Sequence, residues 1–126
     1  MNWAGWAVVA LVAVTGGWML FDGLHALVTG DFVTPSSGTH AGRLGPWSNL
    51  VSGIGLDPRS LLVMWVFVGY AAVYLASVAA FAAGASQAWW AVTLLAVLGL
   101  WYVPFGTVAN LIVLLLMLTP SLRIRG

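Results

Sequence analysis

The chain has 126 residues, of which 62% are hydrophobic and 6% are charged, and its formal net charge is +1. This number of polar side chains is too small to cover the surface of a water-soluble domain. The small net charge gives no basis for nucleic-acid binding or for a polybasic lipid-binding patch. The chain has no cysteine, which excludes disulfides, thiolate metal sites and cysteine nucleophiles. We expect one all-α integral membrane domain, residues 1–126, whose solvent is the lipid bilayer.

The first apolar run predicts a membrane-spanning helix at about residues 3–28. No Lys or Arg precedes the run, and it is longer than the apolar part of a signal peptide, so we expect a retained span. Trp3 and Trp6 at its start are typical of the membrane interface. Gly16 and Gly17 allow a neighbouring helix to approach closely. Gly30 is expected to terminate the helix.

A single polar segment, residues 22–59, follows. It holds seven of the nine charged or titratable side chains: Asp22, His25, Asp31, His40, Arg43, Asp57 and Arg59. Inside it, four apolar residues recur at the helical spacing i, i+3, i+4 and i+7, namely Trp47, Leu50, Val51 and Ile54. This stripe predicts a short helix at about residues 46–54 that lies in the membrane interface, anchored by Trp47.

The next span is predicted at about residues 58–83. Asp57 is a suitable N-cap residue, and Pro58 suits the first helical position. Small residues recur every fourth position along this helix, at Ala72, Ala76, Ala80 and Gly84. Such a ridge lets another helix pack closely in lipid.

The uncharged stretch at residues 87–119 would form a helix of about 50 Å, well beyond the roughly 30 Å of the hydrocarbon core. Pro104 and Gly106 interrupt it, so a hairpin of two helices is predicted, at about residues 87–102 and 106–118. Trp89 and Trp90 indicate one membrane interface. Asn110, in mid-span, is expected to hydrogen-bond between helices, with pore lining as the alternative.

The sequence Pro-Phe-Gly-Thr at residues 104–107 stands inside this apolar tail. In this respect residues 89–120 resemble the C-terminal helix hairpin of many small, uncharacterised bacterial membrane proteins. The resemblance implies a hairpin and a bacterial membrane, and it implies no activity.

Arginines set the expected topology. Four spans put both termini on one side, and Arg123 and Arg125 favour the cytoplasmic side of a bacterial inner membrane for the C-terminus. A three-span arrangement is the alternative, since it would place all four arginines inside. We favour four spans with the interfacial helix in the first loop.

Asp22 and His25 form the most specific candidate functional site in the sequence. At positions i and i+3 they share a helix face near the membrane surface, and a carboxylate that orients an imidazole serves either a metal ligand or a proton relay. The structural alternative is an aspartate that reaches the interface and a histidine bonded to a loop carbonyl. Asp31, His40 and Arg43 extend the candidate site.

Two ion pairs are candidates to shape this segment, Asp31 with Arg43 and Asp57 with Arg59. The spacing of the acidic residues and histidines matches no metal-binding motif, so we expect neither a metal nor another cofactor. No nucleophile motif is present either.

Three functions are compatible with the sequence. The first is a non-catalytic membrane subunit that packs against a larger complex or against copies of itself, with no nucleic-acid partner. The second is a homo-oligomeric channel or transporter for a small solute or ion, with Asp22 and His25 as the protonatable site. The third is an enzyme that acts on a lipid or quinone beside Trp47.

Overall fold

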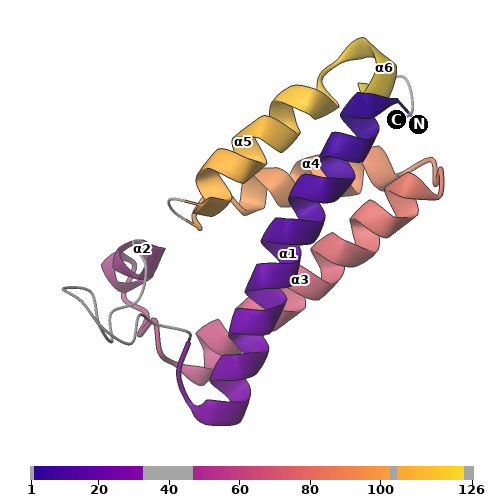
Figure 1. The fold of residues 1–126 in the computed structure, drawn as a ribbon. Helices are drawn as coiled ribbons and strands as arrows, with labels where there is room; N and C mark the ends of the chain where they lie inside the picture. Colours follow the sequence, from indigo (N-terminus) through magenta and orange to yellow (C-terminus); the bar gives the residue numbers. More distant parts are fainter. Residues whose placement is uncertain (1, 33–46, 103–104, 124–126) are drawn as a thin grey trace, which may run out of the picture.

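The computed structural model describes residues 2–32, 47–102 and 105–123. These residues form an all-α structure and contain no strand (Figure 1). Six helices follow in chain order: α1 Trp3–Thr29, α2 Trp47–Gly53, α3 Leu61–Ala82, α4 Ala88–Leu98, α5 Phe105–Met117 and α6 Pro120–Arg123. The expected all-α class is therefore confirmed.

Two of these helices, α1 with 27 residues and α3 with 22, are long and apolar enough to cross a membrane. A span needs about 20 apolar residues to cover the roughly 30 Å hydrocarbon core. The regular parts of α4 and α5 are shorter, with 11 and 13 residues. Helix length alone therefore identifies two candidate spans, and not the four expected from the sequence.

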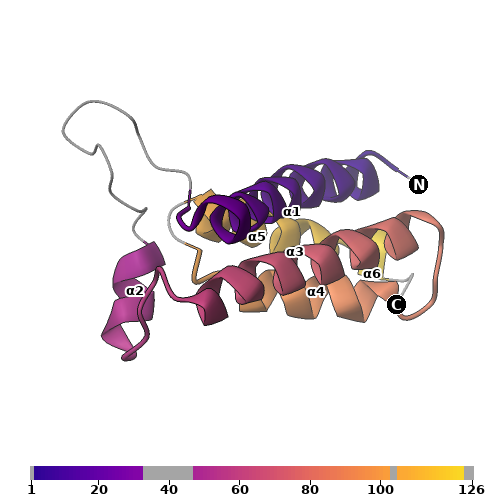
Figure 2. The same cartoon turned by 90° about the horizontal axis from the view of Figure 1, so that it is seen from below.

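The helices α1 and α3 lie side by side and run in opposite directions (Figures 1 and 2). The two helices approach closely at Gly23, where an added Cβ would stand 2.9 Å from the Cβ of Phe67 and 3.1 Å from the backbone nitrogen of Val68. At Gly16 an added Cβ would stand 3.0 Å from Leu75. Gly17, expected to pack against another helix, has no such neighbour within 4 Å.

Capping residues fix the ends of the long helices. Gly30 ends α1 in the left-handed conformation, with φ of 92°, and its N–H donates to the carbonyl of Ala26, as expected for a helix-ending glycine. The N-cap of α3 is Ser60, whose hydroxyl accepts from the N–H of Val63, so the prediction of Asp57 as the cap was wrong. Residues 58–60 form a turn, which moves the first helical residue to Leu61.

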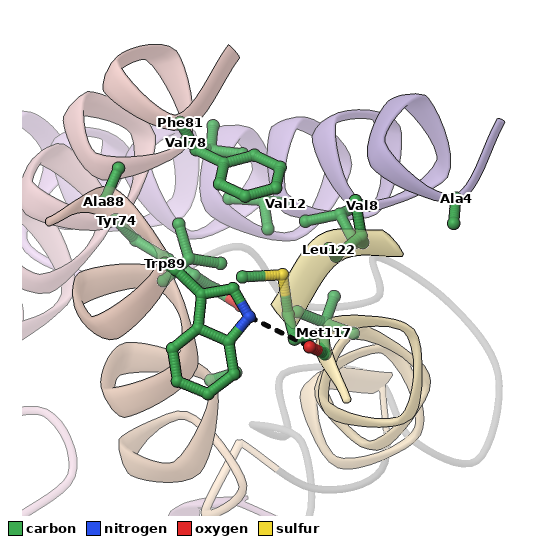
Figure 3. Packing of buried hydrophobic residues seen from close by; sticks show 13 residues of the cluster. Ala4, Val8, Val12, Tyr74, Val78, Phe81, Ala88, Trp89, Met117 and Leu122 are labelled. Atoms are coloured by element: carbon green, nitrogen blue, oxygen red, sulfur yellow. Dashed lines mark hydrogen bonds between the residues drawn. The ribbon is translucent and has the colours of Figure 1, made fainter. Parts of the chain in front are cut away.

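The helices α4 and α5 form the expected hairpin. The turn between them is stabilised by the Thr107 hydroxyl, which donates to the carbonyl of Leu100 at 2.5 Å. Further along, the indole N–H of Trp89 donates to the carbonyl of Met117 at 2.9 Å (Figure 3). Trp89 is buried in this contact and not exposed as an interface anchor, because its indole finds a hydrogen-bond partner inside the hairpin.

Two hydrophobic clusters make up the core. One joins the first half of α1 and the second half of α3 to α4, α5 and α6, and it includes Val8, Tyr74, Trp89 and Met117 (Figure 3). The other joins the second half of α1 and the first half of α3 to α2, and it includes Met19, Phe67 and Trp47. The polar segment is thus attached to one end of the bundle.

Most of the small-residue ridge of α3 does not take part in this core. Ala72, Ala76 and Gly84 are exposed, whereas Ala80 is half-buried and packs against the first cluster. The opposite face of α3 carries its buried large side chains, among them Phe67 and Tyr74. Ala72 and Ala76 are therefore not covered by the other described helices.

The contact at Gly23 gives a direct test of the α1–α3 packing. We expect Gly23→Ala to lower the free energy of unfolding by about 1–3 kcal/mol, because the new methyl group has no space against Phe67 and Val68. Gly17→Ala is the matched control, since its methyl group meets nothing and alanine is the better helix former by roughly 1 kcal/mol. Detergent-induced unfolding followed by circular dichroism measures both. Equal stability of the two variants would contradict the close approach.

Candidate functional site

The polar end of the bundle gathers most of the charged side chains that the structure describes. Asp22 and His25 lie near the end of α1, Asp31 follows that helix, and Asp57 and Arg59 precede α3. His40 and Arg43, expected to extend the site, lie outside the described residues.

His25 has a structural contact. Its Nδ1 lies 2.8 Å from the carbonyl oxygen of Asp31, and the Thr29 hydroxyl lies 3.4 Å from the same nitrogen. Because a carbonyl oxygen only accepts, Nδ1 carries the hydrogen in the bond to Asp31. The Thr29 hydroxyl also donates to the carbonyl of His25. His25 thus ties the end of α1 to the residues that follow it, which is the structural alternative described above.

Asp22 faces the protein interior and is 4% exposed. Its neighbour across the bundle is Tyr102, which lies in the turn between α4 and α5. Burial is the main cause that raises the pKa of Tyr102, the Asp22 carboxylate adds to the increase, and a hydrogen bond with Trp18 partly offsets it. Asp22 therefore lies close enough to the α4–α5 turn to interact electrostatically with Tyr102. A buried carboxyl beside a phenol can hold and release a proton.

An ion pair connects the two long helices at this end. Arg59 Nε lies 2.8 Å from Asp31 Oδ1, and the two side chains are 43% and 45% exposed. The side chain of Asp57 instead accepts from the backbone N–H of Arg59 at 3.0 Å. Exposed ion pairs contribute roughly 0–1 kcal/mol. The pair therefore orients the chain between α1 and α3 more than it stabilises the fold.

An aromatic cluster fastens α2 to the bundle. Trp47 is only 4% exposed, so its ring packs against protein, whereas an interface anchor was expected to be exposed. The ring centroid of Trp47 lies 4.7 Å from Phe67, 5.1 Å from Phe32 and 6.0 Å from Trp101. Offset and edge-to-face rings at these distances attract one another, which explains the burial. By contrast Trp3, Trp6 and Trp90 are exposed, with 74%, 58% and 61% of their surface accessible.

A second polar group lies inside the bundle. The Tyr74 hydroxyl donates to Asn110 Oδ1 at 2.7 Å, which joins α3 to α5. This bond is an interhelical hydrogen bond of the kind expected for Asn110. The Tyr70 hydroxyl donates to the carbonyl of Leu95 and so joins α3 to α4. In the part of the chain that the structure describes, Asn110 Nδ2 and the Thr93 hydroxyl are buried without a hydrogen-bond partner.

The arrangement offers no metal centre within the described residues, where no three His, Asp or Glu side chains lie together. Comparison with protein-family models found no match, and searches of curated proteins and of solved structures found no similar chain. The polar groups that the described residues place inside the bundle include the buried carboxyl of Asp22 and the amide of Asn110, which bonds between helices.

Two of these residues have roles that the sequence analysis did not identify. Neither Tyr102 nor Phe32 was among the candidate site residues. Each is a bulky aromatic residue beside a predicted turn, and such residues often pack across the ends of neighbouring helices. This position beside a predicted turn was the feature of the sequence that could have indicated their packing roles.

We expect the hydrogen bond between Tyr74 and Asn110 to give a coupling energy of about 0.5–2 kcal/mol in a double-mutant cycle. The cycle uses Tyr74→Phe, Asn110→Leu and the double variant, with the free energy of unfolding in detergent as the measurement. Tyr74→Phe leaves Asn110 Oδ1 buried without a donor, so its cost should nearly vanish once Asn110 is replaced. Thr15→Ala serves as the control because its hydroxyl bonds only within α1, and its effect should add to that of Asn110→Leu. Additive effects of Tyr74→Phe and Asn110→Leu would argue against the bond.

Proposed function

We propose that this protein is a small, non-catalytic integral membrane subunit that acts by packing against a larger membrane complex or against copies of itself. The observation that carries the proposal is the exposed small-residue face of α3, defined by Gly69, Ala72 and Ala76. Lipid tails pack against large side chains as well as against small ones, so lipid contact alone gives no reason for such a face. A neighbouring helix does give one, because small residues permit close backbone approach.

The proposal includes four spans, formed by α1, α3, α4 and α5. Ala4 shares a hydrophobic cluster with Leu122, and at the other end of the hairpin Asp22 acts on Tyr102. Ala4 and Asp22 are 18 positions apart in α1, which corresponds to about 27 Å along a helix. The hairpin and its turns thus run alongside α1 for a length close to the full hydrocarbon thickness. This length supports four spans although α4 and α5 are short as regular helices.

The start of α1 and helix α6 lie at the same end of the molecule, opposite α2 (Figures 1 and 2). An even number of spans requires this arrangement. The two arginines of the C-terminal residues, Arg123 and Arg125, favour the cytoplasmic side for that end, and the hairpin resemblance favours a bacterial inner membrane. Helix α2 and the ion pair between Asp31 and Arg59 would then face the opposite side.

A second function, proton-linked transport by a homo-oligomer, is favoured by Asp22. A carboxyl that is 4% exposed on a span is costly, and such residues commonly face a proton or ion pathway. Four helices rarely enclose a pathway alone, so the exposed face of α3 would supply the contact between copies. The two candidates therefore share one association surface and differ in whether Asp22 exchanges protons.

The association surface can be tested by enlarging two of its alanines. We expect the double variant Ala72→Leu and Ala76→Leu to weaken association at least tenfold, because the new side chains keep the partner helix from approaching. Native mass spectrometry after extraction in mild detergent measures the fraction of the 13.3 kDa chain that is bound to copies or to other membrane chains.

The double variant Ala10→Leu and Ala13→Leu is the matched control, since both alanines are exposed on α1 and lie outside the proposed surface. It should associate like the wild type. A wild-type protein that is monomeric at all concentrations, or equal association of the two double variants, would refute the proposal.

Transport can be tested separately in proteoliposomes that contain a pH-sensitive dye. If Asp22 carries protons, the wild type should dissipate an imposed pH gradient and Asp22→Asn should reduce the rate at least tenfold. Asp57→Asn is the control, because this carboxyl is exposed and its amide analogue can still accept from the N–H of Arg59. A wild-type rate no higher than that of empty liposomes would eliminate this second function and leave the subunit proposal standing.

A further inference from the structure

Five of the eight tryptophans expose their indole rings to the surroundings of the bundle. The exposed fractions are 74% for Trp3, 58% for Trp6, 43% for Trp18, 58% for Trp65 and 61% for Trp90. Indole rings favour the boundary between lipid headgroups and hydrocarbon, because the ring is apolar and its N–H group needs an acceptor. The positions of these rings along the bundle therefore indicate the depth at which it sits in a bilayer.

Three of the exposed indoles lie at the end of the bundle where α1 begins. Trp3 and Trp6 are in the first turns of α1. Trp90 follows Trp89 at the start of α4, and Trp89 shares a hydrophobic cluster with Ala4. The rings of Trp3, Trp6 and Trp90 thus form a group at one end of the bundle.

Trp65 lies toward the opposite end, in the second turn of α3. The contact of Gly23 with Phe67 and Val68 fixes the register of the two antiparallel helices. Trp65 precedes these two residues by two or three positions, so it is level with about position 25 or 26 of α1. Trp6 is 19 or 20 positions from that level, which corresponds to about 29 Å along a helix. This distance matches the roughly 30 Å thickness of the hydrocarbon core.

The surface between these two levels is apolar. Its exposed side chains include Val14, Val73 and Leu115, which are 60%, 54% and 69% exposed. None of the described residues that are exposed between the two levels is charged. Arg59 and its partner Asp31 lie beyond the level of Trp65, since Arg59 precedes Trp65 by six positions, or about 9 Å along a helix. Apolar surface and charged residues thus separate at the level of Trp65.

Trp18 is the exposed indole that lies between the two levels, and its polar atom has a partner inside the protein. It hydrogen-bonds with the Tyr102 side chain, and the indole N–H is the donor because an indole has no acceptor. The other four exposed indoles have no acceptor for their N–H groups within the part of the chain that the structure describes. In hydrocarbon an N–H group without a partner is costly, whereas at the interface lipid supplies one.

We propose that the exposed indoles of Trp3, Trp6 and Trp90 lie in one headgroup–hydrocarbon interface of a bilayer and that of Trp65 lies in the other, with their N–H groups donating to phospholipid ester carbonyls. The inference rests on the membrane placement in the proposed function and deepens it, because it sets the depth of the bundle. The ring of Trp18 then contacts acyl chains. Asp22 lies three or four positions from the level of Trp65, and so about 5 Å inside the hydrocarbon core.

Site-directed spin labelling measures this depth, since the chain has no cysteine and an introduced cysteine carries the only label. The single variants Trp6→Cys, Trp65→Cys, Val14→Cys and Val73→Cys are labelled and reconstituted in dioleoylphosphatidylcholine bilayers. The measurement is the ratio of nitroxide accessibility to oxygen, which concentrates in hydrocarbon, over accessibility to a water-soluble nickel chelate. We expect this ratio to be at least tenfold higher at positions 14 and 73 than at positions 6 and 65.

The pattern of ratios separates failure of this inference from failure of the proposed function. A ratio at position 65 or position 6 as high as that at position 73 would overturn the inference, while the membrane placement would stand. Low ratios at positions 14 and 73 would refute the membrane placement and both proposals with it. Association of the chain, measured by native mass spectrometry as above, affects the proposed function alone.

Trp65→Leu tests whether the indole itself sets the depth. The label replaces Val28, which is 85% exposed just beyond the level of Trp65. Without the indole, the exposed Leu61 and Leu62 are free to move into hydrocarbon, so the oxygen-to-nickel ratio at position 28 should rise at least twofold. Trp18→Leu is the matched control, because its ring already lies between the two levels, and it should leave the ratio unchanged. Equal ratios in the two variants would overturn the role of Trp65.

Discussion

The close approach of α1 and α3 at Gly23 is the contact on which the rest of the structure depends. With an added Cβ only 2.9 Å from Phe67 and 3.1 Å from the backbone of Val68, no larger residue fits without displacement. The same contact fixes the rotation of α1, so that the adjacent Asp22 is buried toward the α4–α5 turn. It also brings the end of α1 level with the start of α3, where Asp31 meets Arg59. Close packing of Gly23 against Phe67 and Val68 thus helps to position Asp22, Asp31 and Arg59 at the polar end.

Polar groups inside the bundle follow a different rule from those at its end. Where the surroundings are apolar, side-chain polar atoms bond across helices, as Tyr74 does with Asn110 and Trp89 with the carbonyl of Met117. At the end of the bundle, the polar side chains that pair with one another are partly exposed, as in the ion pair of Asp31 and Arg59. This division leaves the outer surface of the long helices almost purely apolar. In lipid such a surface lowers the free energy of the folded state, and interhelical polar bonds add specificity to the packing.

Features encoded by neighbouring residues could be predicted from the sequence, and features set by distant contacts could not. The helices themselves, the end of α1 at Gly30 and the short helix α2 follow from periodicity and local backbone preferences. The pairing of Asp31 with Arg59 joins residues 28 positions apart, and no local pattern indicates it. The burial of Trp47 and Trp89 was missed for the same reason, since a tryptophan near a span end is equally consistent with a membrane interface or with a protein contact. At the start of α3 the sequence favoured Asp57 as the cap, but residues 58–60 form a turn and Ser60 caps the helix.

The outer face of α3 changes character along its length. Successive positions on this face are Leu62, Trp65 and Val66 near the polar end, and then Gly69, Ala72 and Ala76 toward the other end. Large, exposed side chains keep another helix at a distance, whereas small ones allow a helix to approach. In the proposed function, a partner helix would therefore lie against the second half of α3. Such a partner would leave the polar end with Asp22 and the ion pair of Asp31 and Arg59 uncovered.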